Sequence, residues 1–110
     1  MSEKHGFILC VEETLSIALK PFDYRVHGHD VSIEACWCVG DKRVDIEELA
    51  SLLSKVLKEI DRRPLWEVLE TESATIEDLL LYLKNKIERE RPGLCALKAS
   101  WRRRSIALAL

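Results

Sequence analysis

The chain has 110 residues, 47% of them hydrophobic, and its 17 Lys and Arg residues nearly balance its 19 Asp and Glu residues. This length supports a single domain, residues 1–110, with one hydrophobic core. The formal net charge of −2 argues against nucleic-acid binding by the whole surface. Apolar runs such as Leu79–Leu83 are far shorter than the roughly 20 residues of a membrane-spanning helix, so we expect no membrane partner.

Residue usage indicates the source and the setting of the protein. Gln is absent, Asn85 is the sole Asn, and 33% of the residues are charged, a pattern typical of hyperthermophiles. The first residues lack the basic-then-apolar pattern of a signal peptide, so we expect a cytoplasmic protein. Because a small domain buries a limited fraction of its surface, we also expect a homo-oligomer.

The N-terminal part of the sequence predicts two long strands. Residues Gly6–Leu19 alternate with period two around a polar break at 12–14, which predicts a strand bulged in its middle and ended by Pro21. Residues Val26–Val39 alternate more cleanly, with apolar odd positions and more polar even positions. This second strand should therefore bury one face and leave the other face wetter.

The hydrophobic period then becomes helical. An apolar stripe from Ile46 to Ile60 predicts a helix. Asp45 is placed to cap its N-terminus, and Pro64 should end it at or near Arg63.

The C-terminal half predicts one more helix and two strands. The helix begins at Thr75, where Thr75-x-x-Asp78 resembles a capping box, and stops at Pro92-Gly93. Leu94–Trp101 and Ser105–Leu110 read as strands around the basic turn 102–104. The order β-β-α-α-β-β predicts an α+β fold, a four-stranded antiparallel sheet with two helices packed on one face.

His27 and His29 are the first candidate site residues. Two apart on a strand, they share a face with Cβ atoms about 6–7 Å apart, close enough to bind one metal ion. A catalytic zinc needs three protein ligands, and two histidines on an apolar face are more often packed core residues. Both interpretations stay open at this point.

The cysteines offer no third ligand, because Cys36 and Cys38 occupy the opposite face and lie too far along the strand. If Leu19 lies near His27, antiparallel pairing places Cys10 beside Cys36, where a disulfide is geometrically conceivable. Small buried free thiols are the expectation we prefer, and Cys95 is interpreted as a core residue.

Several segments together resemble one family. His27–Ile33 is similar to the His-Gly-His-Asn/Ser-aromatic-x-Val strand of the 6-pyruvoyl tetrahydropterin synthases and their relatives, the 6-carboxytetrahydropterin synthases. Residues 44–49, 60–66, 75–79 and 92–94 resemble that family's Ile-Asp-Phe-x-x-Leu, Leu-Asp-His-x-x-Leu-Asn and Pro-Thr-Ala-Glu-Asn-Leu motifs and its Pro-Gly-Leu turn. The resemblance implies a T-fold that assembles into trimers or hexamers, with active sites between subunits.

In that family three histidines bind zinc, which polarises the side-chain hydroxyls of dihydroneopterin triphosphate, and a cysteine acts as base. The resemblance maps two zinc ligands onto His27 and His29, but the third falls on Leu19. The base position is Asp23; some relatives have a glutamate there. The implied cofactor is therefore zinc with an incomplete ligand set.

The rest of the family site is also altered. The catalytic relay keeps Asp61, but its histidine is Arg62, which cannot act as a neutral base. The pterin-anchoring glutamate falls on Trp101, and an indole accepts no hydrogen bond. Trp66 replaces the motif's Asn, and Glu77 matches the glutamate of the second-helix motif. Trp66, Trp101 and Glu77 are the candidate residues for binding a pterin or purine-like molecule.

Two functional hypotheses follow. The first is a catalytically degenerate member that keeps the fold and the assembly and binds a related heterocycle, a partner or an active paralogue. The second is an active lyase with a rebuilt site, using zinc on His27 and His29, Asp23 as acid or base, and an indole for ring stacking. A nucleic-acid module built on Trp101–Arg104 is a third reading, but a solvated turn that protects sheet edges explains that run better.

Overall fold

The computed structural model describes residues 5–19, 27–71 and 74–110, and for residues 19 and 27–29 only the backbone. The bounds of its elements are β1 (Phe7–Leu19), β2 (His27–Gly40), α1 (Ile46–Lys58), α2 (Leu65–Val68), α3 (Ile76–Glu90), β3 (Leu94–Trp101) and β4 (Arg104–Ala109). The proposed strand end at Pro21 and strand start at Val26 lie outside the described residues.

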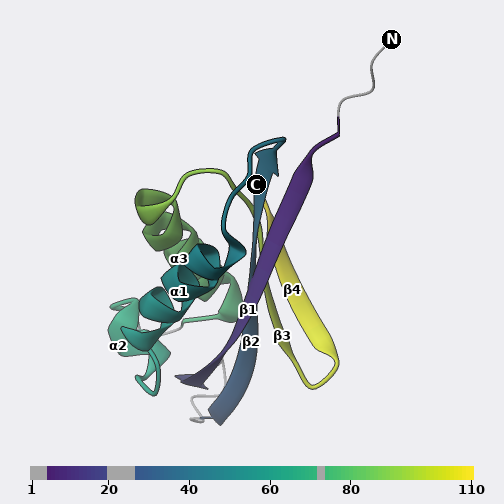
Figure 1. Ribbon diagram of the computed structural model, residues 1–110. Coiled ribbons are helices and arrows are strands. Elements are labelled where there is room, and N and C mark those ends of the chain that lie inside the picture. The colour runs from purple at the N-terminus through teal and green to yellow at the C-terminus, as the bar shows by residue number, and fades with distance from the viewer. Residues whose placement is uncertain (1–4, 20–26, 72–73) are drawn as a thin grey trace.

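The described strands form one antiparallel sheet in the order β1-β2-β3-β4. The helices lie together on one face of this sheet, and the other face is left uncovered (Figure 1). The α+β prediction is confirmed, with one addition. Three helices occur in the described part of the chain, because α2 follows Pro64 as a separate short helix.

The hydrophobic core lies between the sheet and the helices. The odd positions of β2 supply Val31, Ile33, Ala35 and Trp37, each with 0% exposure. The apolar stripes of α1 and α3 cover them, through Leu49, Leu53, Val56 and Leu57 and through Leu79, Leu80, Leu83 and Ile87. The apolar face of β2, which the period-two pattern predicts, therefore packs against the apolar stripes of the helices, which the helical pattern predicts.

The strand pairing is regular where a bulge was expected. Residues 8–19 of β1 pair continuously with β2, and the register shift lies between Phe7 and Ile8. The prediction of a mid-strand bulge at residues 12–14 is therefore wrong. Glu13 sits among buried odd positions but stays exposed, which an edge strand tolerates because one of its sides faces water.

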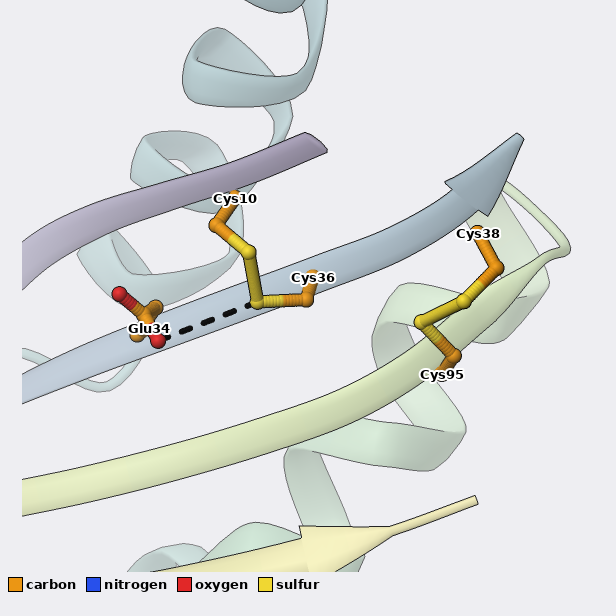
Figure 2. The surroundings of a disulfide bond; sticks show 5 residues. All are labelled: Cys10, Glu34, Cys36, Cys38 and Cys95. Carbon is orange, nitrogen blue, oxygen red and sulfur yellow. Dashed lines mark hydrogen bonds between the residues drawn. A yellow bond between two sulfur atoms is a disulfide. The ribbon is translucent and has the colours of Figure 1, made fainter. Parts of the chain in front are cut away.

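The cysteines lie on the uncovered face of the sheet. Cys10 on β1 is bonded to Cys36 on β2, and Cys38 on β2 is bonded to Cys95 on β3 (Figure 2). The preference for free thiols is therefore wrong, and Cys95 is a half-buried disulfide residue rather than a core residue. The predicted register itself is confirmed, since Leu19 pairs with His27 and Cys10 with Cys36.

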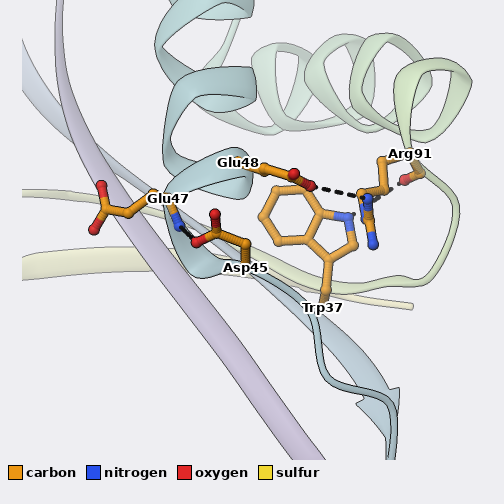
Figure 3. Close-up of polar contacts among 5 residues, drawn as sticks. All are labelled: Trp37, Asp45, Glu47, Glu48 and Arg91. Atoms are coloured by element: carbon orange, nitrogen blue, oxygen red, sulfur yellow. Dashed lines mark hydrogen bonds and ion pairs between the residues drawn. The ribbon is translucent and has the colours of Figure 1, made fainter.

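Trp37 fixes the end of α3 to the sheet. Its indole Nε1 donates a hydrogen bond of 3.3 Å to the carbonyl of Arg91, and the Arg91 guanidinium approaches Glu48 on α1 at 4.0 Å (Figure 3). Asp45 caps α1 by accepting a 3.0 Å bond from the Glu47 N–H, as predicted. These contacts place the helix ends over one end of β2.

The observed bounds of α1, α3 and β4 can be compared with the bounds predicted from the sequence. Thr75 and Asp78 form the predicted capping box of α3. The first helix ends at Lys58, with Glu59 as its C-cap, rather than near Arg63. Strand β4 starts one residue earlier and ends one residue earlier than predicted. No helix of the described residues is long and apolar enough to cross a membrane.

Candidate functional site

The candidate histidines lie on a two-stranded extension of the sheet. The Cα partners of His27 and His29 are Leu19 and Ile17 on β1. Pairing between β2 and β3 starts only at Ser32, so residues 27–31 are paired with β1 alone. Asp23, the candidate acid or base, lies outside the described residues.

Asp61 binds the free edge of β1 beside this extension. Its Oδ1 accepts a 2.8 Å hydrogen bond from the Ser16 N–H, and the Arg62 N–H donates a 2.7 Å bond to the Ser16 carbonyl. Pro64 continues the contact by forming a parallel bridge with Ala18. The turn 61–64 therefore covers the edge of β1, and the Asp61 carboxylate is engaged in holding it there.

Asp61 and the histidines still lie at the same level of the sheet. Ser16 is bound to Asp61 on one side and is adjacent in sequence to Ile17, the partner of His29. Strands are spaced by about 4.8 Å, so β1 separates Asp61 from the His29 backbone by roughly 10 Å. The structure thus brings Asp61 and the backbone of the two histidines to one end of the sheet, on opposite sides of β1.

The three candidate substrate-binding residues are spread over three elements. Trp66 is half-buried on α2, and Trp101 is half-buried at the end of β3, where it packs against the core. Glu77 is exposed in the first turn of α3. It lines a groove of about 130 Å³ together with Leu80, Leu81, Ile106, Ala107 and Leu108. This groove belongs to the β4 side of the sheet, so Glu77 is separated from the His27 extension by the width of the sheet.

Two candidate metal ligands, His27 and His29, belong to the described part of the extension. Such a zinc takes three protein ligands and keeps an open position. His27 and His29 provide two imidazoles, and the residue paired with His27 is a leucine, which has no donor atom. Among the described residues of these two paired strands, no third metal-binding side chain lies beside the histidines.

A second group of metal-ligating side chains lies on the uncovered face. The ligand atoms of Cys10, Glu34 and Cys36 all lie within 4.8 Å of one another. The Cys36 sulfur is 3.8 Å from the Glu34 Oε1 (Figure 2). Sequence reasoning missed this group, although the signal was present: the register placed Cys10 beside Cys36, and Glu34 precedes Cys36 by two residues on the same face.

A four-stranded antiparallel sheet with its helices on one face is the architecture of the T-fold expected from the resemblance. A solved structure, that of Caenorhabditis elegans 6-pyruvoyl tetrahydropterin synthase, matches with a TM-score of 0.81. The match covers 100% of this chain and 99% of that chain, at 16% sequence identity. Family models and curated proteins give no match to the sequence. The chain therefore has the fold of a 6-pyruvoyl tetrahydropterin synthase in strongly diverged form.

Proposed function

We propose that the chain is a 6-pyruvoyl tetrahydropterin synthase-like protein that keeps the fold and subunit assembly and lacks the lyase chemistry. The observation that carries this proposal is the pairing of Leu19 with His27, because the residue beside the two histidines supplies no third ligand. With no third protein ligand among the described residues of these strands, zinc would not be held as the family reaction requires.

The contacts of Asp61 support the same proposal. In the relay that the resemblance implies, this carboxylate would orient a histidine, but the next residue is Arg62. The Asp61 carboxylate instead accepts the Ser16 N–H, and the Arg62 backbone binds the Ser16 carbonyl. A structural role on the sheet edge accounts for the retention of Asp61 without catalysis.

Apolar side chains at both edges of the sheet support a homo-oligomer, a trimer or a hexamer. Phe7 and Ile8 on the β1 edge are 50% and 63% exposed, and Leu81 beside the β4 groove is 49% exposed. Contact between the β1 edge of one copy and the β4 edge of the next would cover both regions. Such a heterologous contact closes a ring when its rotation permits.

The two disulfides are relevant to the cellular compartment and the type of organism in which the protein occurs. Cytosolic disulfides are rare in mesophiles, whereas the cytosolic proteins of hyperthermophiles are often rich in them. A cytoplasmic protein of a thermophile is therefore the setting that agrees with both the residue usage and the Cys10–Cys36 and Cys38–Cys95 bonds.

The zinc content of the oxidised protein tests the proposal. With both disulfides closed, the protein purified without chelator should contain less than about a tenth of an equivalent of zinc per chain, because two imidazoles alone hold the ion weakly. His27→Ala is the matched variant and should not change that value. A full equivalent of zinc that disappears in His27→Ala would overturn the proposal in favour of an active zinc lyase.

A further inference from the structure

We propose that Cys10, Glu34 and Cys36 form a redox-gated metal site, which is closed as a disulfide and binds a thiophilic divalent cation such as zinc once reduced. The site is separate from the histidine extension. Cys10 and Cys36 are at the opposite end of the β1–β2 pair, more than seven residues along the strands from His27.

The backbone already sets the ligands at suitable positions. Cys10 and Cys36 are directly opposite one another, with Cα atoms 4.1 Å apart, the close spacing of a non-hydrogen-bonded pair. Glu34 projects from the same face of β2 and is already in contact with the Cys36 sulfur. Zinc binds sulfur at about 2.3 Å and carboxylate oxygen at about 2.0–2.2 Å, so its ligand atoms lie about 3.5–3.8 Å apart. All three ligand atoms are within 4.8 Å of one another, and side-chain rotation alone can bring reduced sulfurs to that spacing.

The local charges favour a cation. Glu12 is paired directly with Glu34 across the strands, and like charges in that arrangement repel. Two cysteine thiolates would add further negative charge at the next pair along, and Lys98 on β3 is the single cation paired to Glu34 in the described sheet. A divalent ion bound between the two sulfurs and Glu34 would neutralise this cluster.

The burial of the three residues suits a metal site in which neighbouring side chains hold two of the ligands and solvent reaches the third. Cys36 is 9% exposed and Glu34 is half-buried, which fixes their positions, while Cys10 is exposed. One oxygen of the Glu12 carboxylate accepts a hydrogen bond from the Ser32 hydroxyl. The fourth position of a tetrahedral ion is left to water.

The gating step is an ordinary thiol–disulfide exchange. A dithiol reductant transfers two electrons and two protons to the Cys10–Cys36 bond, becomes a disulfide itself, and leaves two cysteine thiols. The metal then binds two thiolates and displaces two protons. Exchange of the empty dithiol with an oxidised, disulfide-bonded partner transfers the two electrons and two protons to that partner, restores the Cys10–Cys36 bond and excludes the metal.

Cobalt titration of the reduced protein tests the proposal. The Cys38→Ser/Cys95→Ser variant removes the other cysteine pair, which has no third ligand of this kind among the described residues. After anaerobic reduction this variant should bind one equivalent of Co²⁺ with thiolate-to-cobalt charge-transfer absorption, and zinc should displace it. The oxidised variant should show no such absorption. Glu34→Gln in the same background should weaken binding by at least the roughly tenfold seen for lost supporting groups.

The control is Cys10→Ser/Cys36→Ser, which keeps the Cys38–Cys95 pair and should show no charge-transfer band. The near-ultraviolet circular dichroism of the tryptophans, among which Trp37 is fully buried, reports whether the reduced protein stays folded. Absence of the band in the folded, reduced Cys38→Ser/Cys95→Ser variant would overturn the proposal. So would equal affinity after Glu34→Gln, or binding that appears only when the near-ultraviolet tryptophan signal is lost.

Discussion

Removing the hydrogen bond between Asp61 and Ser16 tests whether the Asp61 carboxylate has a structural role. In the structure the Oδ1 of half-buried Asp61 accepts the Ser16 N–H at 2.8 Å, across 45 residues of sequence. A hydrogen bond to a charged group contributes about 1.5–3 kcal/mol. Because Asp61 is partly exposed to water, we expect Asp61→Ala to lower the free energy of unfolding by about 1–2 kcal/mol.

Asp61→Asn keeps a carbonyl oxygen that can accept the same N–H, so its loss should be about half as large. The assay is urea unfolding with the disulfides intact, followed by tryptophan fluorescence. Asp41→Ala is the control, since the exposed Asp41 carboxylate makes no hydrogen bond or ion pair with the described residues. An Asp61→Ala protein within about 0.5 kcal/mol of this control, the usual range for surface substitutions, would refute the reasoning.

Three other predictions address the metal position, the hairpin and the assembly. Leu19→His should raise the zinc affinity of the oxidised protein by roughly tenfold or more, because it restores a third imidazole beside His27; unchanged affinity in a zinc titration would contradict the register-based mapping. Arg102 and Arg103 both have positive φ, at 44° and 65°, in a two-residue hairpin loop that favours Asn-Gly, so Arg102→Asn/Arg103→Gly should raise stability by about 1–2 kcal/mol in thermal unfolding. A lower melting temperature would count against this. Leu81→Arg should shift the oligomer towards monomer in light scattering without unfolding it, and an unchanged mass would exclude the β4 edge from the interface.

The fold could be predicted because each long element carries its own pattern. The alternation along residues 26–39 predicts the apolar face of a strand, and the stripe from Ile46 predicts the apolar face of the helix that covers it. The register of the first two strands followed from one assumption, that Leu19 lies beside His27. The short helix α2 escaped prediction because four residues are too few to show a helical period. Pro64, interpreted only as a helix stop, also begins that helix as its N-cap.

The contacts of the site were less predictable, because they join residues far apart in sequence. The Ser16–Asp61 bond and the Pro64–Ala18 bridge depend on how the turn 61–64 packs on a strand edge, and no periodic pattern carries that information. The Cys10–Cys36 pairing was geometrically foreseen, but small buried free thiols were the preferred interpretation, because free cysteine is among the most buried residue types. In this chain the geometry was the better guide.

Turnover of dihydroneopterin triphosphate is the most direct measurement of the central claim. The purified protein should be incubated with this substrate and added zinc, with the Caenorhabditis elegans 6-pyruvoyl tetrahydropterin synthase run beside it as a positive control. We expect no product above the rate without protein. Product formation at a rate comparable to the control enzyme would contradict the proposed loss of lyase chemistry.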